Sequence, residues 1–553
     1  MTTESNRFVP APIHVVAERL GIDPRYVIPY GRDKAKLDLA ALDAPRRRQA
    51  DSKLVLVSAI TPTRAGEGKT TTTIGLTQAL ARLGHSACAA LREPSLGPCM
   101  GVKGGATGGG ASQIIPSASI NLHFTGDLHA ITTAHNLIAA ALDNRLFHGD
   151  DLGIDPRRVT WRRVMDMNDR ALRNCVIGLG GTAQGVPRET GFDITAASEV
   201  MAMLCLAESV DDLRKRVDRA LIAYTKKGEP VTASRLGITG AVLALLNDAV
   251  MPNLVQTLEG TPTVVHGGPF ANIAHGCNSV LATRMALHHA DWVVTEAGFG
   301  FDLGAEKFFD IKCRTARLDP AAIVLVATVR ALKLHGGVGY DALSEPNPGA
   351  VERGLENLEK HIESAQGFGK PVVVALNRFA TDSDDELAVI ARACERKGVL
   401  HSLADHFARG GEGARDLAEK VVAEGSKPTA PFTPMYALED SVEAKVRSVA
   451  TRIYGAKDVA FTPQASKAIA AATKNGYGNL PICIAKTQNS LSDDATKLGR
   501  PRDFTVTVRD IQISAGAGFI VVLTGDILRM PGLPLVPAAE RIDVINGEIV
   551  GLI

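Results

Sequence analysis

The chain has 553 residues, 45% of them hydrophobic and 22% charged, which is the composition of a globular protein with large buried cores and excludes a disordered chain. Its 61 lysines and arginines nearly balance its 60 aspartates and glutamates, and both signs are scattered, so nothing indicates a nucleic-acid partner or a charged membrane surface. We therefore expect small-molecule ligands and, at about 150 residues per domain, three or four domains.

Cysteine spacing and the N-terminal segment bear on where the protein works. The 8 cysteines lie far apart and form no CxxC pair, which argues against a zinc or dithiol site and favours a reduced, cytoplasmic setting. The first thirty residues lack the features of a signal peptide, and no uninterrupted apolar stretch reaches about 18 residues. The sequence predicts a cytoplasmic protein without a membrane-spanning segment.

Short β-branched runs followed by helical patterns predict the parallel strands of an α/β protein. In chain order the predicted strands are 54–60, 85–91, 292–295, 323–328 and 372–376, and strand-like segments return at 504–509 and 518–524. Apolar and charged spacing predicts helices over 71–83, 213–226 and 351–366. A doubly wound parallel sheet accounts for this alternation with the fewest assumptions.

The segment TRAGEGKT, between the first predicted strand and its helix, is a candidate phosphate-binding loop (P-loop). Its small residues would let backbone N–H groups surround phosphate oxygens at the positive end of the helix. Lys69 would reach the β and γ phosphates, and the Thr70 hydroxyl would hold Mg²⁺. The predicted nucleotide-binding residues are Thr63, which replaces the first glycine of the usual motif, and Arg64, Ala65, Gly66, Glu67, Gly68, Lys69 and Thr70.

Two further segments indicate which nucleotide the loop would bind and which substrate group would lie beside it. The nearest match to the guanine-reading motif of GTPases, Asn377 to Ala380, lacks its lysine and its aspartate, which favours ATP. Arg92 follows the strand predicted over 85–91, and because parallel strands end at one crevice, it could stand beside the phosphates and bind a carboxylate. The alternative for Arg92 is a surface salt bridge with Glu93.

Seven blocks carry a resemblance to the formate–tetrahydrofolate ligase family, and they extend from about residue 30 to about residue 540. They are TPTRAGEGKTTTTIGL, LREPSLGPCMGVKGGATGGG, INLHFTGDLHAITTAHNLIAAALDN, VVTEAGFGFDLGAEKFFDIKCR, VLVATVRALKLHGG, AKTQNSLSDD and TGDILRMPGLP. The resemblance implies a P-loop NTPase-like fold and an enzyme of one-carbon metabolism. Such an enzyme joins formate to tetrahydrofolate with MgATP, by way of formyl phosphate, and yields 10-formyltetrahydrofolate, ADP and phosphate.

The same resemblance assigns roles to individual residues. Lys69 and Arg92 would be catalytic, with Arg92 near formate and formyl phosphate. Phe379 and Phe407 would bind the folate ring between them, although many members have tryptophan where this chain has Phe407, and ordinary packing remains the alternative for that ring. Asn489 replaces a tyrosine that is common in the family. A homotetramer and a monovalent cation, potassium or ammonium, are also implied.

Other polar residues leave their roles open. Asp127 and Glu296 could handle a metal or a substrate amine, or could be a helix cap or a buried ion pair. His123, His129 and His135 recur every six residues, which places them on no single helical face, so we interpret them as structural.

The expected division has three parts. Residues 1–355 form the P-loop nucleotide-binding catalytic domain, 356–455 a second α/β domain contributing to the folate site, and 456–553 a C-terminal α/β domain. The proline- and threonine-rich stretch 425–434 indicates a boundary nearby. The glycine-rich run 101–110 is interpreted as a functional loop rather than a tether.

Two other functions remain possible from the sequence. One is an ATP-dependent ligase or amidotransferase that activates a larger carboxylate. The other is a nucleotide-controlled switch or partitioning ATPase, which would hydrolyse ATP slowly without formate or tetrahydrofolate.

Overall fold

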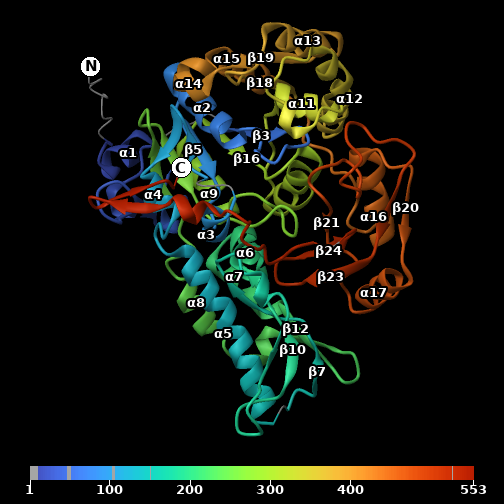
Figure 1. The fold of residues 1–553 in the computed structure, drawn as a ribbon. Coiled ribbons are helices and arrows are strands. Elements are labelled where there is room, and N and C mark those ends of the chain that lie inside the picture. The colour runs from blue at the N-terminus through green and yellow to red at the C-terminus, as the bar shows by residue number, and fades with distance from the viewer. Residues whose placement is uncertain (1–9, 46–50, 103–105, 150, 526, 553) are drawn as a thin grey trace.

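A computed structural model describes residues 10–45, 51–102, 106–149, 151–525 and 527–552. Its largest element is a 12-stranded sheet (Figure 1). The strands lie in the order β1 (Val27–Pro29), β2 (Ala35–Leu37), β14 (Asn253–Thr257), β15 (Pro262–Val265), β4 (Ala87–Leu91), β16 (Trp292–Glu296), β3 (Lys53–Ala59), β17 (Ala322–Ala327), β18 (Val372–Asn377) and β19 (Leu400–Ala404), while β6 (Ser112–Ile115) pairs with β14 and β5 (Gly108–Gly109). From β15 to β19 every neighbouring pair is parallel.

Both faces of the parallel part are covered, which is why its strands read as continuous apolar runs. Val55 and Val57 of β3 pack with α2 (Lys69–Arg82) and α15 (Arg415–Gly425). The alternate residues Leu54 and Leu56 pack on the opposite face, in the core formed with α9 (Val280–His289), α11 (Val329–His335) and α12 (Pro348–Gln366). A strand alternates its side chains between faces, so β3 connects two hydrophobic layers.

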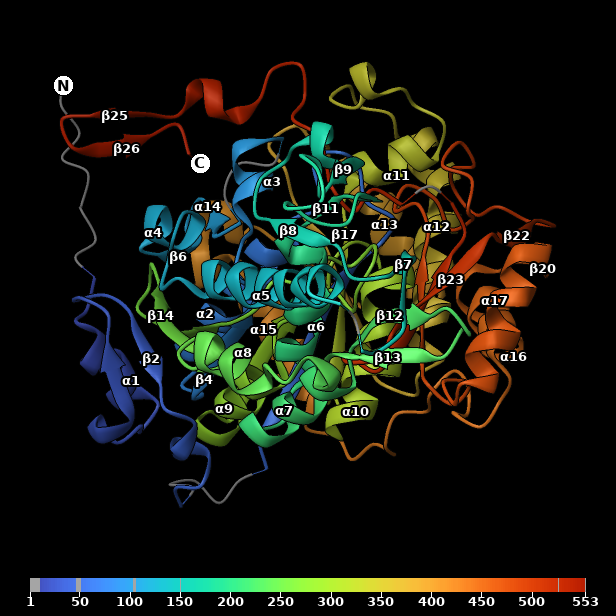
Figure 2. The same cartoon turned by 90° about the horizontal axis from the view of Figure 1, so that it is seen from below.

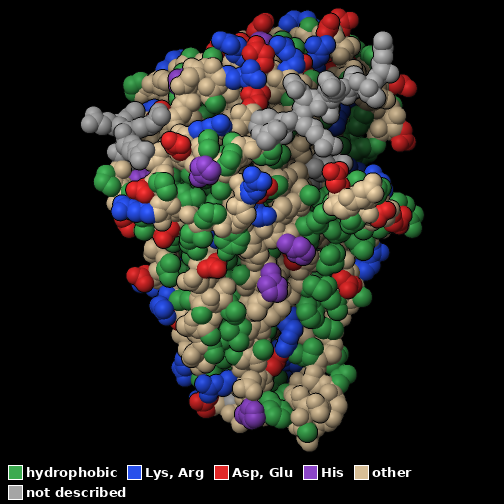
Figure 3. All heavy atoms as spheres, turned by 90° about the vertical axis from the view of Figure 1, so that its left-hand side faces the viewer, with side chains coloured by type: hydrophobic (Ala, Val, Ile, Leu, Met, Phe, Trp, Pro, Cys, Tyr) green, Lys and Arg blue, Asp and Glu red, His purple; other side chains and the backbone are tan. Residues whose placement is uncertain are grey.

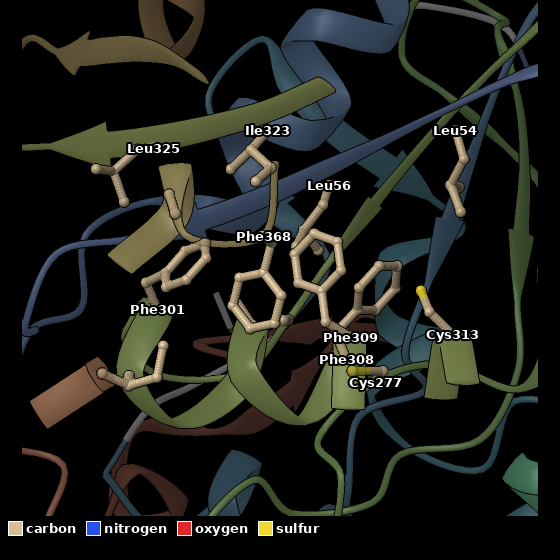
Figure 4. Close-up of a cluster of buried hydrophobic side chains, with 14 of the residues drawn as sticks. Leu54, Leu56, Cys277, Phe301, Phe308, Phe309, Cys313, Ile323, Leu325 and Phe368 are labelled. Atoms are coloured by element: carbon tan, nitrogen blue, oxygen red, sulfur yellow. The ribbon is translucent and has the colours of Figure 1, made fainter. Parts of the chain in front are cut away.

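Phenylalanine rings fill the second layer (Figure 4). They come from the π-helical turns Phe301–Ala305 and Phe308–Cys313 and from Phe368 after α12. Phe309 stacks on Phe368 with ring centroids 4.3 Å apart and an interplanar angle of 15°. This stack joins the segment after β16 to the end of α12, beneath the central strands.

A second lobe, the lower part of Figure 1, is built on the long helix α5 (Asp127–Phe147), and its hydrophobic core also takes in Cys483, Ala485, Phe519 and Val521 of the C-terminal part. Its other elements are β7 (Ile154–Val159), β8 (Arg163–Met165), β9 (Cys175–Ile177), β10 (Arg188–Thr190), β11 (Phe192–Ile194), α6 (Glu199–Leu206), α7 (Val210–Arg219), β12 (Leu221–Thr225), β13 (Pro230–Thr232) and α8 (Thr239–Leu246). The sheet β13–β12–β7 is small, so helix packing supplies most of this core.

The C-terminal part lies at the side of the main sheet (Figure 1). It contains α16 (Val442–Val449), β20 (Asp458–Phe461), α17 (Pro463–Lys474), β21 (Ile482–Ala485), β22 (Thr505–Val508), β23 (Asp510–Ser514) and β24 (Phe519–Leu523). The chain then returns across the molecule to a hairpin, β25 (Asp543–Ile545) with β26 (Glu548–Val550), that stands away from the body (Figure 2). On the face drawn in Figure 3, basic and acidic side chains are interspersed rather than gathered by sign.

Most predicted elements are confirmed within two residues at either end, including the strands predicted over 54–60, 292–295, 323–328 and 372–376 and the helix over 71–83. The helix predicted over 213–226 is wrong in its second half, because α7 ends at Arg219 and β12 follows at Leu221. Burial of Leu221, Ile222 and Ala223 between β13 and β7 outweighs the helical spacing.

Three other expectations, which concern the domain boundary, the glycine-rich run and membrane-spanning helices, can be compared with the fold. Residue 355, where the first domain is expected to end, lies inside α12, and β18 and β19 beyond it extend the same sheet as β3. Within the glycine-rich run 101–110, residues 103–105 lie outside the described part. Among the described residues, no helix is long and apolar enough to cross a membrane.

Candidate active site

Six neighbouring strands end at one edge of the main sheet and bring segments far apart in the sequence together there. In spatial order these strands are β4, β16, β3, β17, β18 and β19. Arg92 follows β4, Glu296 ends β16, the loop 60–68 follows β3, Thr328 follows β17 and Asn377 ends β18. The carboxyl edge of a parallel sheet is where ligands bind in open α/β folds, so this edge is the candidate active site.

The loop 60–68 turns tightly between β3 and α2. Gly66 and Gly68 both adopt φ +77°, a left-handed conformation that a side chain would strain. A Cβ at Gly68 would also collide with the Asn377 amide, so both the backbone conformation and the space around it favour glycine at this position. Gly68 precedes α2, whose first N–H groups and positive dipole end face the same edge.

Glu67 holds the loop from inside. Its side chain is 1% exposed. One carboxylate oxygen accepts the Thr63 N–H at 2.6 Å and the other accepts the Thr328 hydroxyl. Arg330 pairs with the same carboxylate at 3.7 Å, and Asn377 donates to the Glu67 carbonyl at 3.0 Å. The sequence predicts Glu67 among the nucleotide-binding residues; its side chain and its carbonyl are engaged within the protein, so its part in binding would fall to the backbone N–H.

The Thr70 hydroxyl meets an acidic side chain. It donates a hydrogen bond of 2.8 Å to one oxygen of Glu296. The other Glu296 oxygen lies 3.8 Å from the Arg92 guanidinium. Arg92 therefore pairs with Glu296, at the end of the neighbouring strand β16, rather than with Glu93, and the alternative of a surface salt bridge with Glu93 is wrong.

Arg92 keeps donor capacity at this edge. Its Nη1 donates only a long hydrogen bond, 3.4 Å, to the Pro269 carbonyl. Its Nε is buried and has no hydrogen-bond partner within the described part of the chain. The Arg92 side chain as a whole is 25% exposed, so its terminal N–H groups remain available to an anionic ligand at this edge. Lys69 begins α2, one residue after Gly68, on the same side of the sheet.

The residues at Thr70 and Glu296 fit Mg²⁺. A hydroxyl and a carboxylate within hydrogen-bonding distance of each other are hard oxygen donors, and magnesium sites use one or two carboxylates completed by water and substrate phosphates. Neither Thr70 nor Glu296 belongs to a cluster of three or more metal-ligating side chains, since the described residues contain no such cluster. A site of this kind would depend on nucleotide to complete its ligands.

Phe379 and Phe407 follow neighbouring strands at the same edge. Phe379 is half-buried and the Arg330 guanidinium carbon lies 4.1 Å from its ring centroid. Phe407 is 55% exposed, its carbonyl accepts the Ala111 N–H at 2.8 Å, and its ring lies against Gly109. The exposed Phe407 ring has little packing to account for it, and the half-buried Phe379 ring follows the neighbouring strand, so these two rings remain the candidates for a flat ligand.

Several residues at this edge were not predicted from the sequence. The sequence singles out Asn377 only as part of an incomplete guanine-reading motif, whereas in the structure its amide donates a hydrogen bond to the loop. His406 contacts the Thr72 hydroxyl at 3.2 Å, and burial lowers its pKa to about 4, so its ring is neutral at pH 7. Arg330 lies in the block VLVATVRALKLHGG, which the resemblance already singled out, and that block was the available signal.

The structure also gives the surroundings of Asp127 and Glu296, whose roles the sequence leaves open. Asp127 forms a buried ion pair with Lys36 at 2.8 Å and accepts the Asn253 amide at 2.7 Å, so the buried-pair interpretation is the one found. Glu296 lies at the candidate site instead. His135 is buried on α5 and stacks on Trp161 with centroids 4.3 Å apart, as a structural histidine would.

The sequence profile of the family described as formate–tetrahydrofolate ligase matches residues 3–553. The chain belongs to that family. It is therefore an ATP-dependent ligase that joins formate to tetrahydrofolate, and formate, tetrahydrofolate and ATP with Mg²⁺ are its substrates and metal.

Two solved structures to which the chain is similar show only a weak likeness. A mutant of L. casei FPGS is 11% identical with a TM-score of 0.20, covering 81% of this chain and 78% of that one. The apo form of L. casei FPGS is 12% identical with a TM-score of 0.14, covering 70% of this chain and 93% of that one. TM-scores this low do not establish a shared fold.

Proposed function

We propose that the edge formed by the loop 60–68, Lys69, Thr70, Arg92 and Glu296 is where this ligase activates formate with ATP. The observation that carries the proposal is the convergence of a glycine-containing loop at a helix N-terminus with an arginine that is 25% exposed and, among the described residues, makes only one long hydrogen bond. This edge supplies fixed positive charge where two anions must meet.

The first step transfers a phosphoryl group. A carboxylate oxygen of formate attacks the γ-phosphorus of ATP, the bond to the β-phosphate oxygen breaks, and ADP leaves, which yields formyl phosphate. Backbone N–H groups of the loop and Lys69 hold the phosphates, while Arg92 orients formate and offsets the charge of the transferred group. Thr70 and Glu296 would hold Mg²⁺, which would neutralise phosphate charge when bound.

The second step forms the carbon–nitrogen bond. The N10 amine of tetrahydrofolate attacks the formyl carbon, phosphate leaves, and the amine loses its proton. Phosphate is a good leaving group, whereas the oxide of free formate is not, so activation by ATP makes the reaction feasible. Phe379 and Phe407 stack the folate ring and bring N10 to the formyl group, each stack contributing about 0.5–1.5 kcal/mol beyond burial.

The oligomer and the cation rest on family resemblance. We expect a cytoplasmic homotetramer activated by potassium or ammonium. The division into a catalytic domain over 1–355 and two smaller α/β domains also remains a proposal.

One mixture tests the function. Enzyme, MgATP, formate and tetrahydrofolate are incubated in potassium buffer and acidified, and the absorbance of methenyltetrahydrofolate is recorded. We expect product and ADP release that both require formate and tetrahydrofolate. Slow ATP hydrolysis without either substrate would indicate the nucleotide switch, and turnover with a larger carboxylate in place of formate would indicate the other ligase class.

A further inference from the structure

Arg330, near the start of α11, contacts the glycine-rich loop and the Phe379 ring at once. Its guanidinium carbon lies 4.1 Å from the Phe379 centroid, over the ring. The same group donates to the Gly66 carbonyl and lies 3.7 Å from the Glu67 carboxylate. One planar cation thus connects the loop proposed to hold nucleotide with the ring proposed to hold folate.

A second link keeps the loop and the Phe379 turn in register. Asn377, the last residue of β18, donates to the Glu67 carbonyl at 3.0 Å. Two residues later the Phe379 N–H donates to Asp382 at 2.8 Å. The backbone of the loop and of the Phe379 turn is therefore fixed. The Arg330 side chain, which contacts both, is 24% exposed and can respond to a ligand at either one.

We propose that Arg330 is a positioning residue that couples the nucleotide site to the folate site, an inference that rests on the proposed function of both. A ligand at the loop that immobilises the Arg330 guanidinium also fixes it over Phe379, so a folate ring arriving second loses less conformational entropy. The same holds in the reverse order, because coupling between two binding sites is reciprocal. Each ligand accordingly strengthens the binding of the other.

A merely structural arginine would behave differently. It would support the loop and the ring separately, so its removal would weaken both ligands without changing how one affects the other. Lysine at this position keeps the charge but cannot stack as a plane or reach Gly66 and Glu67 together. Arg330→Lys and Arg330→Met should therefore act alike on the coupling.

The experiment measures Kd for ADP with and without saturating tetrahydrofolate, and Kd for tetrahydrofolate with and without saturating ADP. We expect about a tenfold mutual tightening in the wild type and less than about twofold in Arg330→Lys and Arg330→Met. Arg447→Met is the matched control, because Arg447 also lies over a ring, that of Phe461 at 5.7 Å, and also pairs with a carboxylate, that of Asp458.

The outcomes separate the two proposals. A wild type that binds no tetrahydrofolate refutes the proposed function. A wild type that binds both ligands independently, or an Arg330→Lys protein that keeps the full coupling, refutes the role of Arg330 and leaves the proposed function standing. Loss of coupling in Arg447→Met as well would show that the effect is not specific to Arg330, and would also overturn the inference.

Discussion

Lys69 is the first residue of α2, next to the left-handed Gly68, so its charge lies where the loop would receive phosphates. Lys69→Ala should lower the rate of ADP formation by at least about a hundredfold, since a charge aimed at the transferred phosphoryl group is removed. The variant should keep the melting temperature of the wild type. Lys427→Ala, an exposed lysine paired with Glu424, is the control and should remain active.

Phe407 is the smaller ring at a position where tryptophan is common in the family. Phe407→Trp should lower KM for tetrahydrofolate by about two- to threefold, because the larger ring adds only part of the about 0.5–1.5 kcal/mol that a whole stack contributes. KM for ATP should stay unchanged. Because the ring is 55% exposed, a larger one meets little steric resistance. An unchanged KM for tetrahydrofolate would remove Phe407 from the folate site.

His135 permits a pH prediction away from the active site. Burial lowers its pKa from 6.5 to about 3, while Nε2 bonds to the Arg162 carbonyl. The unfolded chain therefore binds a proton that the folded chain refuses, so the stabilisation is complete above pH 6.5 and is lost as pH falls toward 3. At pH 5 the wild type should have lost about 2 kcal/mol of this contribution.

The comparison uses His135→Gln, which cannot titrate. Free energies of unfolding in urea are measured for both proteins at pH 7.5 and pH 5. The difference between the two pH values should be larger in the wild type by about 2 kcal/mol. Equal differences would mean that His135 keeps an ordinary pKa in the folded protein.

The loop 60–68 is a structural element whose shape is set by one buried carboxylate. Glu67→Ala would leave the buried Thr63 N–H without its acceptor and free the Thr328 hydroxyl, a loss of about 1–3 kcal/mol for an unsatisfied group. We expect a lower melting temperature and a raised KM for ATP. Glu419→Ala, which removes an exposed pair with Arg415 on α15, should change neither.

Regular elements differed in how well local spacing identified them. The strand over 372–376 is buried on both faces, so its apolar run identifies it without knowledge of its partners. The chain from Leu213 onward has the spacing of a helix, yet β12 begins at Leu221, because β13 and β7 offer a pairing that burial favours. Local spacing does not identify the partners of a strand.

At the scale of the whole molecule, the homotetramer and the activating monovalent cation stay predictions. We expect a native mass of four chains by light scattering, and activity that rises when potassium or ammonium replaces tetramethylammonium at constant ionic strength. A monomer with full activity in the absence of both cations would contradict both expectations. Neither composition nor the single chain carries a signal for them.

The sequence alone predicted the chemistry that we propose for the loop, because two glycines, a lysine at a predicted helix start and a following threonine are adjacent in the chain. It also predicted Arg92, through the order of strand and loop. Only the tertiary structure decided that Glu296 meets Thr70, that Asp127 is paired with Lys36, and that Arg330 and Asn377 support the loop. Those contacts join residues that lie from 91 to 310 positions apart in the chain. The order of the strands in the sheet brings distant segments together, and the local pattern of apolar and polar residues does not encode that order.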